Sequence, residues 1–138
     1  MKHKTKIVVP FVFVLLTIPQ FVSAQSNDVI DRLIEQNTAT YADAYYMVQA
    51  AAGNTAENPS ESGSERKITL GEYSHLIMQT FELPGGLMYR LFPGPRYATR
   101  EIAYQGFIRG IEMPGRTISG REVLNILRRV MEWKEESA

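Results

Sequence analysis

The chain has 138 residues, 15 Lys and Arg, 15 Asp and Glu, and no Cys, so its formal net charge is zero. A chain of this length buries one hydrophobic core, and the lack of Cys excludes disulfides and thiolate metal sites. Stability must therefore come from apolar packing, which predicts a single, mostly helical domain.

The N-terminus has the pattern of an export signal. Three lysines within the first six residues precede an apolar stretch over residues 7–19, and the segment 21–24 (FVSA) puts small residues where signal peptidase reads them. The stretch is shorter than the roughly 20 residues that span a bilayer as a helix. We therefore expect residues 1–24 to be a signal peptide. The mature protein is expected to begin at Gln25, to have no membrane span and to work in the periplasm or at the cell surface.

A pair of helices is expected over residues 25–52. In the first, Asp28 to Gln36, apolar side chains follow one side of the helix, and Asn27 can cap its start. The second follows Thr40 and ends at Gly53.

A polar tract over residues 53–67 follows this pair. It contains one Ala and no larger apolar side chain, so it cannot offset the entropy of ordering itself. The tract is predicted to be a flexible linker to a C-terminal helical region over residues 68–138.

One signal recurs three times along the chain: a hydroxyl residue followed three positions later by a carboxylate. The copies are Thr40 and Asp43, Thr69 and Glu72, and Ser119 and Glu122. In this capping-box pattern the hydroxyl oxygen accepts a hydrogen bond from the first helical turn, and the carboxylate accepts one from the N–H of the cap residue. Apolar residues recur at matching positions after each copy, which predicts three helices with equivalent buried stripes. The last of them should run to about Trp133.

Between the second and third copies the sequence predicts a loop, a helix and another loop. Residues 83–94 are rich in Gly, Pro and aromatic side chains, which is typical of a loop. The segment 95–105 begins with Pro and is followed by Gly106, as a short helix would be. With a second loop over residues 107–117, this order favours an all-α class, a small bundle of two to three helix pairs.

The C-terminal part of the chain resembles an S-layer homology (SLH) module. A short helix ends in Gln105-Gly106-Phe107-Ile108-Arg109-Gly110, and Ile118-Ser119-Gly120-Arg121-Glu122 opens an amphipathic helix. SLH modules have a first helix that ends in a Gly-Ile-Ile-like turn and a second helix that is capped by a Thr-Arg-Ala-Glu motif. Residues 27–52 resemble a shortened copy, and residues 68–81 resemble a lone second helix. The resemblance implies degenerate SLH-like modules in an exported bacterial envelope protein, and the family generally anchors proteins to cell-wall polysaccharide.

The chain departs from that family where the family binds its ligand. The position of the motif Arg holds Tyr41, Leu70 and Gly120 in the three copies, and Arg121 lies one residue later. One residue along a helix turns a side chain by about 100 degrees, so Arg121 need not do the same work. Tyr97 is the only substitute for an aromatic residue that the family has near its first helix. The resemblance therefore favours a shared fold more than polysaccharide binding.

Two kinds of residue are candidates for binding. The segment 87–93 carries large apolar side chains, which are typical of interface centres. Arginines dominate residues 90–129, whereas acids dominate residues 25–65, and Arg suits bidentate contacts with carboxylate or phosphate. Several of these arginines can instead pair with neighbouring acids. The expected partner-binding residues are Tyr89, Arg90, Phe92, Tyr97, Arg100 and Arg121.

These observations predict a non-enzymatic interaction or scaffold protein of the bacterial envelope that binds a protein partner. The alternative is a cell-wall polysaccharide or peptidoglycan anchor that uses Arg100, Arg121 and Tyr97. A third hypothesis is a small hydrolase centred on Glu72 and His75, although no third group to orient the pair is evident. No metal, cofactor or nucleic acid is expected.

Overall fold

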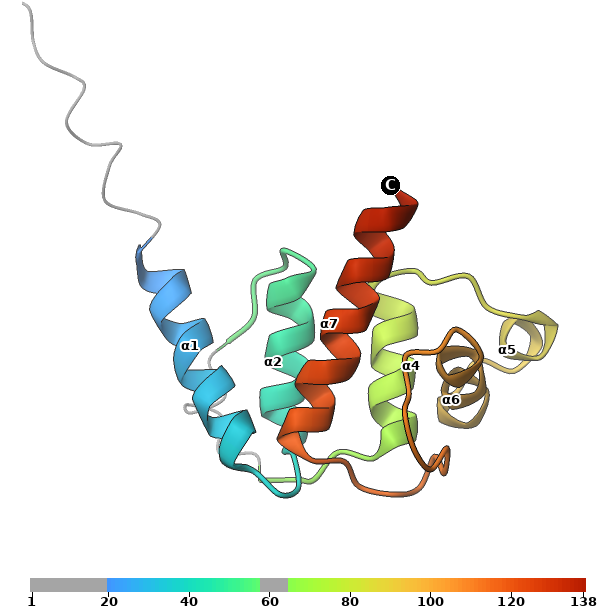
Figure 1. The fold of residues 1–138 in the computed structure, drawn as a ribbon, viewed down its shortest axis with the longest axis horizontal. Coiled ribbons are helices and arrows are strands. Elements are labelled where there is room, and N and C mark those ends of the chain that lie inside the picture. Colours follow the sequence, from blue (N-terminus) through green and yellow to red (C-terminus); the bar gives the residue numbers. More distant parts are fainter. Residues whose placement is uncertain (1–19, 58–64) are drawn as a thin grey trace, which may run out of the picture.

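The computed structural model describes residues 20–57 and 65–138, which form six α-helices and no strand (Figure 1). The helices are α1 (Gln20–Glu35), α2 (Tyr41–Ala51), α4 (Leu70–Thr80), α5 (Leu87–Leu91), α6 (Pro95–Tyr104) and α7 (Gly120–Ser137). The predicted all-α class is confirmed. No helix within the described ranges is long and apolar enough to cross a membrane.

Two sequence predictions fall wholly or partly outside the described residues. Most of the expected signal peptide, residues 1–19, is not described, and neither is the middle of the expected linker, residues 58–64. At the end of the linker, the backbone N–H of Tyr41 donates to the Arg66 carbonyl (2.7 Å), and the Arg66 guanidinium lies 4.3 Å from the centre of the Tyr41 ring. The last residues of the expected linker are therefore attached to the start of α2.

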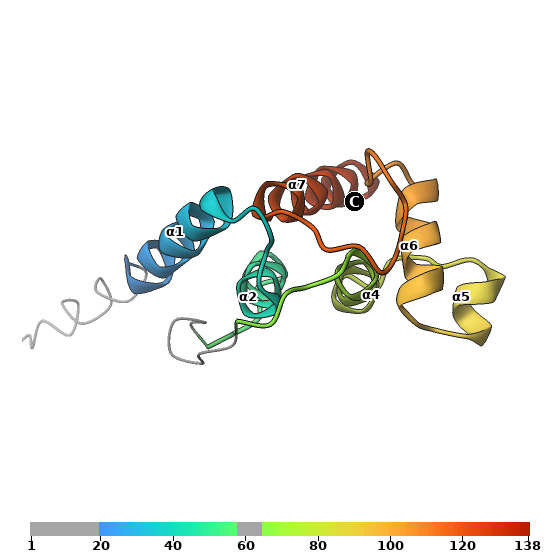
Figure 2. The same ribbon diagram turned by 90° about the horizontal axis from the view of Figure 1, so that it is seen from below.

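The centre of the molecule is a frame of three parallel helices, α2, α4 and α7, which begin at the same end (Figure 1). Helix α1 runs in the opposite direction and packs on α7 and α2. Helix α6 crosses α4 and packs against it, and α5 packs on α6 at the edge of the molecule (Figure 2).

Backbone hydrogen bonds join the three frame helices at the end where they begin. The segment before α2 pairs with the segment before α4 through Ile68 N–H to the Ala39 carbonyl (3.0 Å). The segment before α4 pairs with that before α7 through Leu70 N–H to the Arg116 carbonyl (2.8 Å). Ala39 N–H in turn donates to the carbonyl of Ile118 (2.7 Å). The three repeated segments of the sequence thus meet in space and satisfy one another's backbone groups.

The three predicted caps differ in how complete they are. At α4 the box is reciprocal: Glu72 N–H donates to the Thr69 hydroxyl (3.2 Å), and Thr69 N–H donates to the Glu72 carboxylate (2.9 Å). Thr40 and Ser119 also accept from the N–H of Asp43 (3.3 Å) and Glu122 (3.2 Å). The helices therefore begin where the hydroxyls predict.

The return bond from the acid is missing in the other two copies, so the expectation of a full box was wrong there. Thr40 N–H donates to the Gln36 side chain (3.2 Å), because the short Asp43 side chain accepts instead from Arg32 (3.0 Å) and the Gln36 amide (2.8 Å). The Thr40 hydroxyl still donates to the Asp43 carboxylate (3.0 Å), so the first acid stays bonded to the side chain of its cap residue. In the third copy, the Glu122 carboxylate forms an ion pair with Arg116 instead, because a guanidinium is a strong partner for a carboxylate.

The apolar stripes of the three copies face one core. Ala44, Tyr73 and Val123, which occupy the same register position, are all 0% exposed. The Tyr73 hydroxyl donates to the Val123 carbonyl at 2.7 Å, and burial raises the pKa of this phenol. This hydrogen bond therefore links helices α4 and α7 at the centre of the core.

Three boundaries differ from the sequence predictions. Helix α1 already includes Gln20, the first described residue, and so extends N-terminal to the expected start at Asp28, because no Gly or Pro interrupts residues 20–35. It therefore crosses the expected cleavage point. Helix α7 continues past Trp133 to Ser137 for the same reason. The prediction of a loop throughout residues 83–94 was wrong for the one-turn helix α5, which begins after an extended Gly86.

Candidate functional sites: an apolar ridge and an arginine-lined cavity

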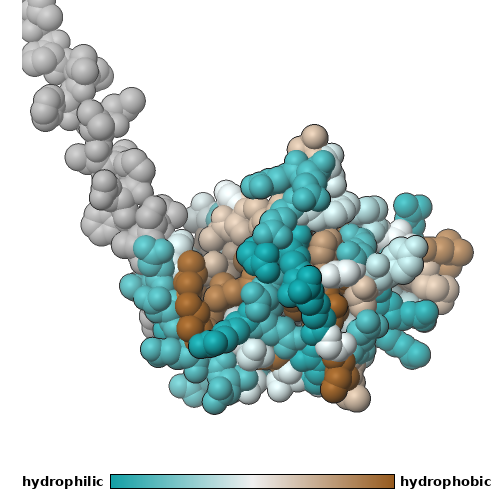
Figure 3. All heavy atoms as spheres, viewed as in Figure 1, coloured by the Kyte–Doolittle hydropathy of each residue, from teal (hydrophilic) through white to brown (hydrophobic). Residues whose placement is uncertain are grey.

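Helix α5 exposes an unusual amount of apolar surface. Its outward side chains Leu87, Met88 and Leu91, together with Phe92 directly after the helix, are here called the apolar ridge. They are 71%, 43%, 60% and 61% exposed. No residue of α5 is buried. In Figure 3, brown and tan atoms gather at the end of the molecule where Figure 1 places α5. Contiguous apolar surface of this kind marks interaction sites on folded proteins.

Tyr89 has a different role from the ridge residues around it. Its hydroxyl hydrogen-bonds with Nδ1 of His75 on α4 at 3.2 Å, and the two rings meet edge to face with centroids 6.0 Å apart. Burial raises the pKa of Tyr89. Tyr89 therefore attaches α5 to the frame and leaves its neighbours to face solvent.

The structure groups some of the predicted binding residues and separates others. Phe92 lies against Tyr97, with ring centroids 6.5 Å apart, and Arg90 is exposed on α5, which ends just before Phe92. Arg100 lines one cavity, together with Tyr104 and others, whereas Arg121 lines a different one on α7. The alternative that joins Arg100 and Arg121 in one polysaccharide site therefore has no shared groove to support it.

The cavity that contains Arg121 is the second candidate site. It has a volume of about 420 Å³ and lies between the loop that follows α6 and the first turns of α7. Most of the polar side chains that line it are arginines or neutral hydrogen-bond donors. The lining residues are Arg109, Gly110, Ile111, Arg116, Ser119, Arg121, Glu122, Asn125, Ile126 and Arg129. We call it the arginine-lined cavity.

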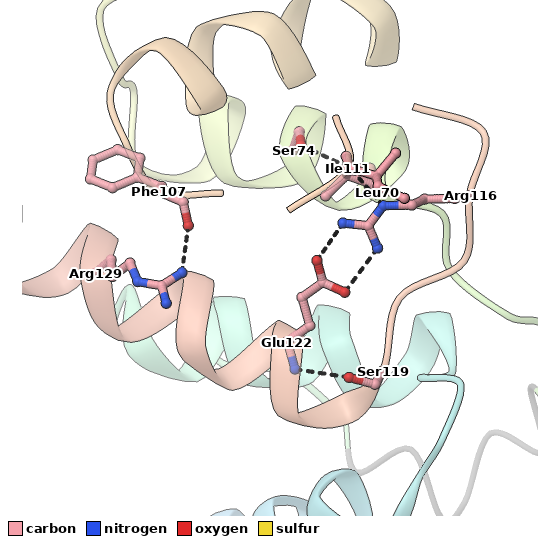
Figure 4. Close-up of polar contacts among 8 residues, drawn as sticks. All are labelled: Leu70, Ser74, Phe107, Ile111, Arg116, Ser119, Glu122 and Arg129. Carbon is pink, nitrogen blue, oxygen red and sulfur yellow. Dashed lines mark hydrogen bonds and ion pairs between the residues drawn. The ribbon is translucent and has the colours of Figure 1, made fainter. Parts of the chain in front are cut away.

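One acid and one arginine of this cavity neutralise each other. Arg116 presents two nitrogens to the two oxygens of Glu122, with Nη1 to Oε2 at 2.9 Å (Figure 4). The paired carboxylate raises the pKa of Arg116. The Arg116 Nε also donates to the carbonyl of Ile111 (2.6 Å), which fixes the loop against α7. This pair is part of the scaffold of the cavity.

Arg129 is held from one side only. Its Nη1 donates to the Phe107 carbonyl at 2.8 Å (Figure 4), but its buried Nε has no hydrogen-bond partner among the described residues. Burial and the positive charges of Arg109 and Arg128 lower the pKa of Arg129. Arg129 is not among the binding residues that the sequence predicts. Its spacing from Arg121 and Asn125, at i+8 and i+4 on one helix face, was the available signal.

The residues proposed for hydrolysis are engaged elsewhere. Glu72 accepts from Arg66 (2.6 Å) and from the Thr69 N–H (2.9 Å), while His75 bonds to Tyr89. Burial favours the neutral acid, but these donors outweigh it and hold the pKa of Glu72 below its usual range. A carboxylate kept ionised in this way is a poor general acid. Among the described residues no group of three His, Asp or Glu could hold a metal ion.

The position of the SLH motif Arg in the third copy has no room for a side chain. A Cβ atom on Gly120 would lie 1.7 Å from the Leu33 carbonyl oxygen of α1. Gly120 N–H instead donates to the Gln36 carbonyl at 3.0 Å, because the two backbones approach so closely. The departure from the motif is therefore tied to the packing of α1 on α7.

Comparisons with protein-family models, with curated proteins and with solved structures found no match. The SLH resemblance stays a prediction, and the function must be argued from the two candidate sites.

Proposed function

We propose that this chain is a non-enzymatic interaction or scaffold protein that docks on a protein partner through the apolar ridge of α5. The observation that carries the proposal is the exposure of four large apolar side chains, between 43% and 71%, three on a helix of five residues and the fourth, Phe92, directly after it. Burial of apolar surface stabilises a protein or a complex by about 25 cal/mol per Å², and these side chains do not gain this free energy while they face water. A partner that covers the ridge recovers this free energy.

The surroundings of the ridge indicate the partner's chemistry. Arg90 and Arg96 are exposed beside it, on α5 and at the start of α6, and the Arg96 guanidinium lies 6.0 Å from the centre of the Tyr97 ring. An apolar centre with a basic rim matches an apolar patch bordered by acids. We therefore propose a protein partner with that pattern.

We place this function in the bacterial cell envelope because of the export signal predicted over residues 1–24. The wall-polymer anchor built on Arg100, Arg121 and Tyr97 has less support, since its two arginines line different cavities.

The test places a photocrosslinking side chain at Leu91 and, as a control, at Tyr104, an α6 side chain that is 90% exposed outside the ridge. We expect one specific protein adduct from Leu91 in the native envelope and none from Tyr104. Phe92→Ala should weaken the interaction by about 2 kcal/mol, the usual effect of removing an anchor residue, while Tyr104→Ala should not. Moderate salt should have little effect, because the centre of the interface is apolar.

Equal adducts from both positions would contradict a docking role for the ridge. So would undiminished capture by a folded Leu91→Ala, Phe92→Ala double variant. Thermal melts of each variant separate a lost interaction from a lost fold.

A further inference from the structure

The arginine-lined cavity holds more positive charge than its own acids neutralise. Glu122 is the only acidic residue that lines it, and Arg116 already occupies both of its carboxylate oxygens. Arg109, Arg121 and Arg129 form no ion pair with any described residue. Three like charges around one cavity repel one another unless an anion lies between them.

The three arginines approach the cavity from two directions. Arg121, Asn125 and Arg129 follow one face of α7, and eight residues of helix separate the two arginines by about 12 Å. Arg109 comes from the loop after α6 and is close enough to affect the titration of Arg129. Guanidinium groups that come from backbone positions this far apart suit a ligand with two or more anionic groups, because each guanidinium can contact a different group.

Arg129 is already oriented for a ligand. The Phe107 carbonyl holds one of its nitrogens at 2.8 Å, and its Nε is a buried donor without an acceptor among the described residues. Such a donor is destabilising until an acceptor reaches it. Arg109 makes no hydrogen bond within the described residues, and Arg121 makes only a long one, from Nε to the carbonyl of Ile34 (3.4 Å). Their guanidinium groups are therefore available.

We propose that the arginine-lined cavity binds an oxyanion with at least two charged groups, through Arg109, Arg121 and Arg129. Phosphate and carboxylate oxygens share the geometry that guanidinium groups recognise. Asn125 adds an amide N–H donor. Ser119, whose oxygen already accepts from Glu122 N–H, still has its hydroxyl proton to donate. Binding here is independent of the apolar ridge, because no ridge residue lines the cavity.

The test is calorimetric titration of the full chain with pyrophosphate and, in a second arm, with citrate, at constant ionic strength set by sodium chloride. We expect saturable binding of at least one of the two ions. The stronger of the two identifies phosphate or carboxylate as the natural group. Arg109→Gln and Arg121→Gln should each weaken binding by roughly tenfold, the effect of losing one charge-assisted contact. Both variants should stay folded, because Arg109 makes no side-chain hydrogen bond within the described residues and Arg121 makes only the long one to Ile34.

The control is Lys67→Gln, which removes one positive charge from an exposed residue outside both the cavity and the apolar ridge. It should leave the affinity unchanged. Fluorescence gives a second readout, because Trp133 is the only Trp and its ring lies 6.1 Å from that of Phe107, whose carbonyl holds Arg129. No saturable binding of either ion would overturn the proposal. Equal weakening by Lys67→Gln, or full affinity in the Arg109→Gln, Arg121→Gln double variant, would do the same.

Discussion

The end of the molecule where α2, α4 and α7 begin differs from α5 in how its side chains are used. At that end the cap hydroxyls, the acids that follow them and the backbone of the preceding segments all find partners within the chain. Helix α5 has no buried residue, and the apolar ridge formed by α5 and Phe92 leaves four apolar side chains in solvent. The first region shows how the repeated sequence holds the fold together. The second shows where the chain has apolar surface that its own fold does not need.

The comparison predicts that the frame should tolerate change far less than α5. The strictest test is Gly120→Ala, because a Cβ atom there would lie 1.7 Å from the Leu33 carbonyl oxygen, a backbone atom that cannot rotate away. We expect urea denaturation to show a loss of about 3 kcal/mol or more in the free energy of unfolding. Gly115→Ala is the control: a Cβ there meets nothing within 4 Å and should change stability by less than about 0.5 kcal/mol. Equal stability of the two variants would show that α1 does not pack on α7 as described.

A smaller effect is expected from Tyr73→Phe, which removes one hydroxyl from the core of the frame. The lost bond to the Val123 carbonyl (2.7 Å) is fully buried, and such a loss destabilises by about 1 to 2 kcal/mol. Tyr104→Phe removes the same atom from a side chain that is 90% exposed and should be neutral. Thermal melts of the pair measure the difference. If Tyr104→Phe were the more destabilising change, the place of Tyr73 at the centre of the core would be wrong.

The caps give the next smaller effect, which ranks the second and third copies. Thr69→Ala should destabilise by about 1 kcal/mol, since it removes the hydroxyl of the one reciprocal box. Ser119→Ala should be somewhat milder, because Glu122 is held by Arg116 whether or not the cap is present. Chemical denaturation of both variants tests the order. A larger loss for Ser119→Ala would contradict the difference between the two caps.

The smallest effect is a dependence on acid. The pKa of Glu72 is lower in the folded chain than in the unfolded one, so its stabilising effect is fully present above the unfolded value of about 4.3 and is lost as the pH falls through the folded value. Glu72→Gln should therefore reduce stability at pH 7, and the reduction should become smaller as the pH falls below about 4.3. Arg66→Gln should reduce the same pH dependence in part, because Arg66 is one of the donors that lower the pKa. Melting temperatures across this range provide the measurement, and an identical pH profile for wild type and Glu72→Gln would refute the assignment.

Sequence patterns predicted the frame because its signals are local. A hydroxyl three residues before an acid marks a helix start wherever it occurs, and the starts after Thr40, Thr69 and Ser119 follow from it. The stripe that buries Tyr73 and Val123 follows from helical periodicity alone.

The candidate sites depend on contacts that no local pattern contains. Helix α5 is too short for a periodic signal, and Tyr89 attaches to the frame only because His75, fourteen positions earlier, lies opposite it. The arginine-lined cavity combines Arg109 from a loop with two arginines of α7, and only the fold brings them together. Arg100 and Arg121 look alike in the sequence but line different cavities for the same reason.

The parallel direction of α2, α4 and α7 has an electrical consequence. Each helix carries a dipole equivalent to about half a positive charge at its start, and three helices that begin together concentrate this charge at one end of the molecule. Asp43, Glu72 and Glu122 lie in the first turns of the three helices, where their negative charges oppose the combined dipoles. The repeated acid of the sequence thus does more than complete a cap, because it allows three dipoles of the same direction to pack side by side.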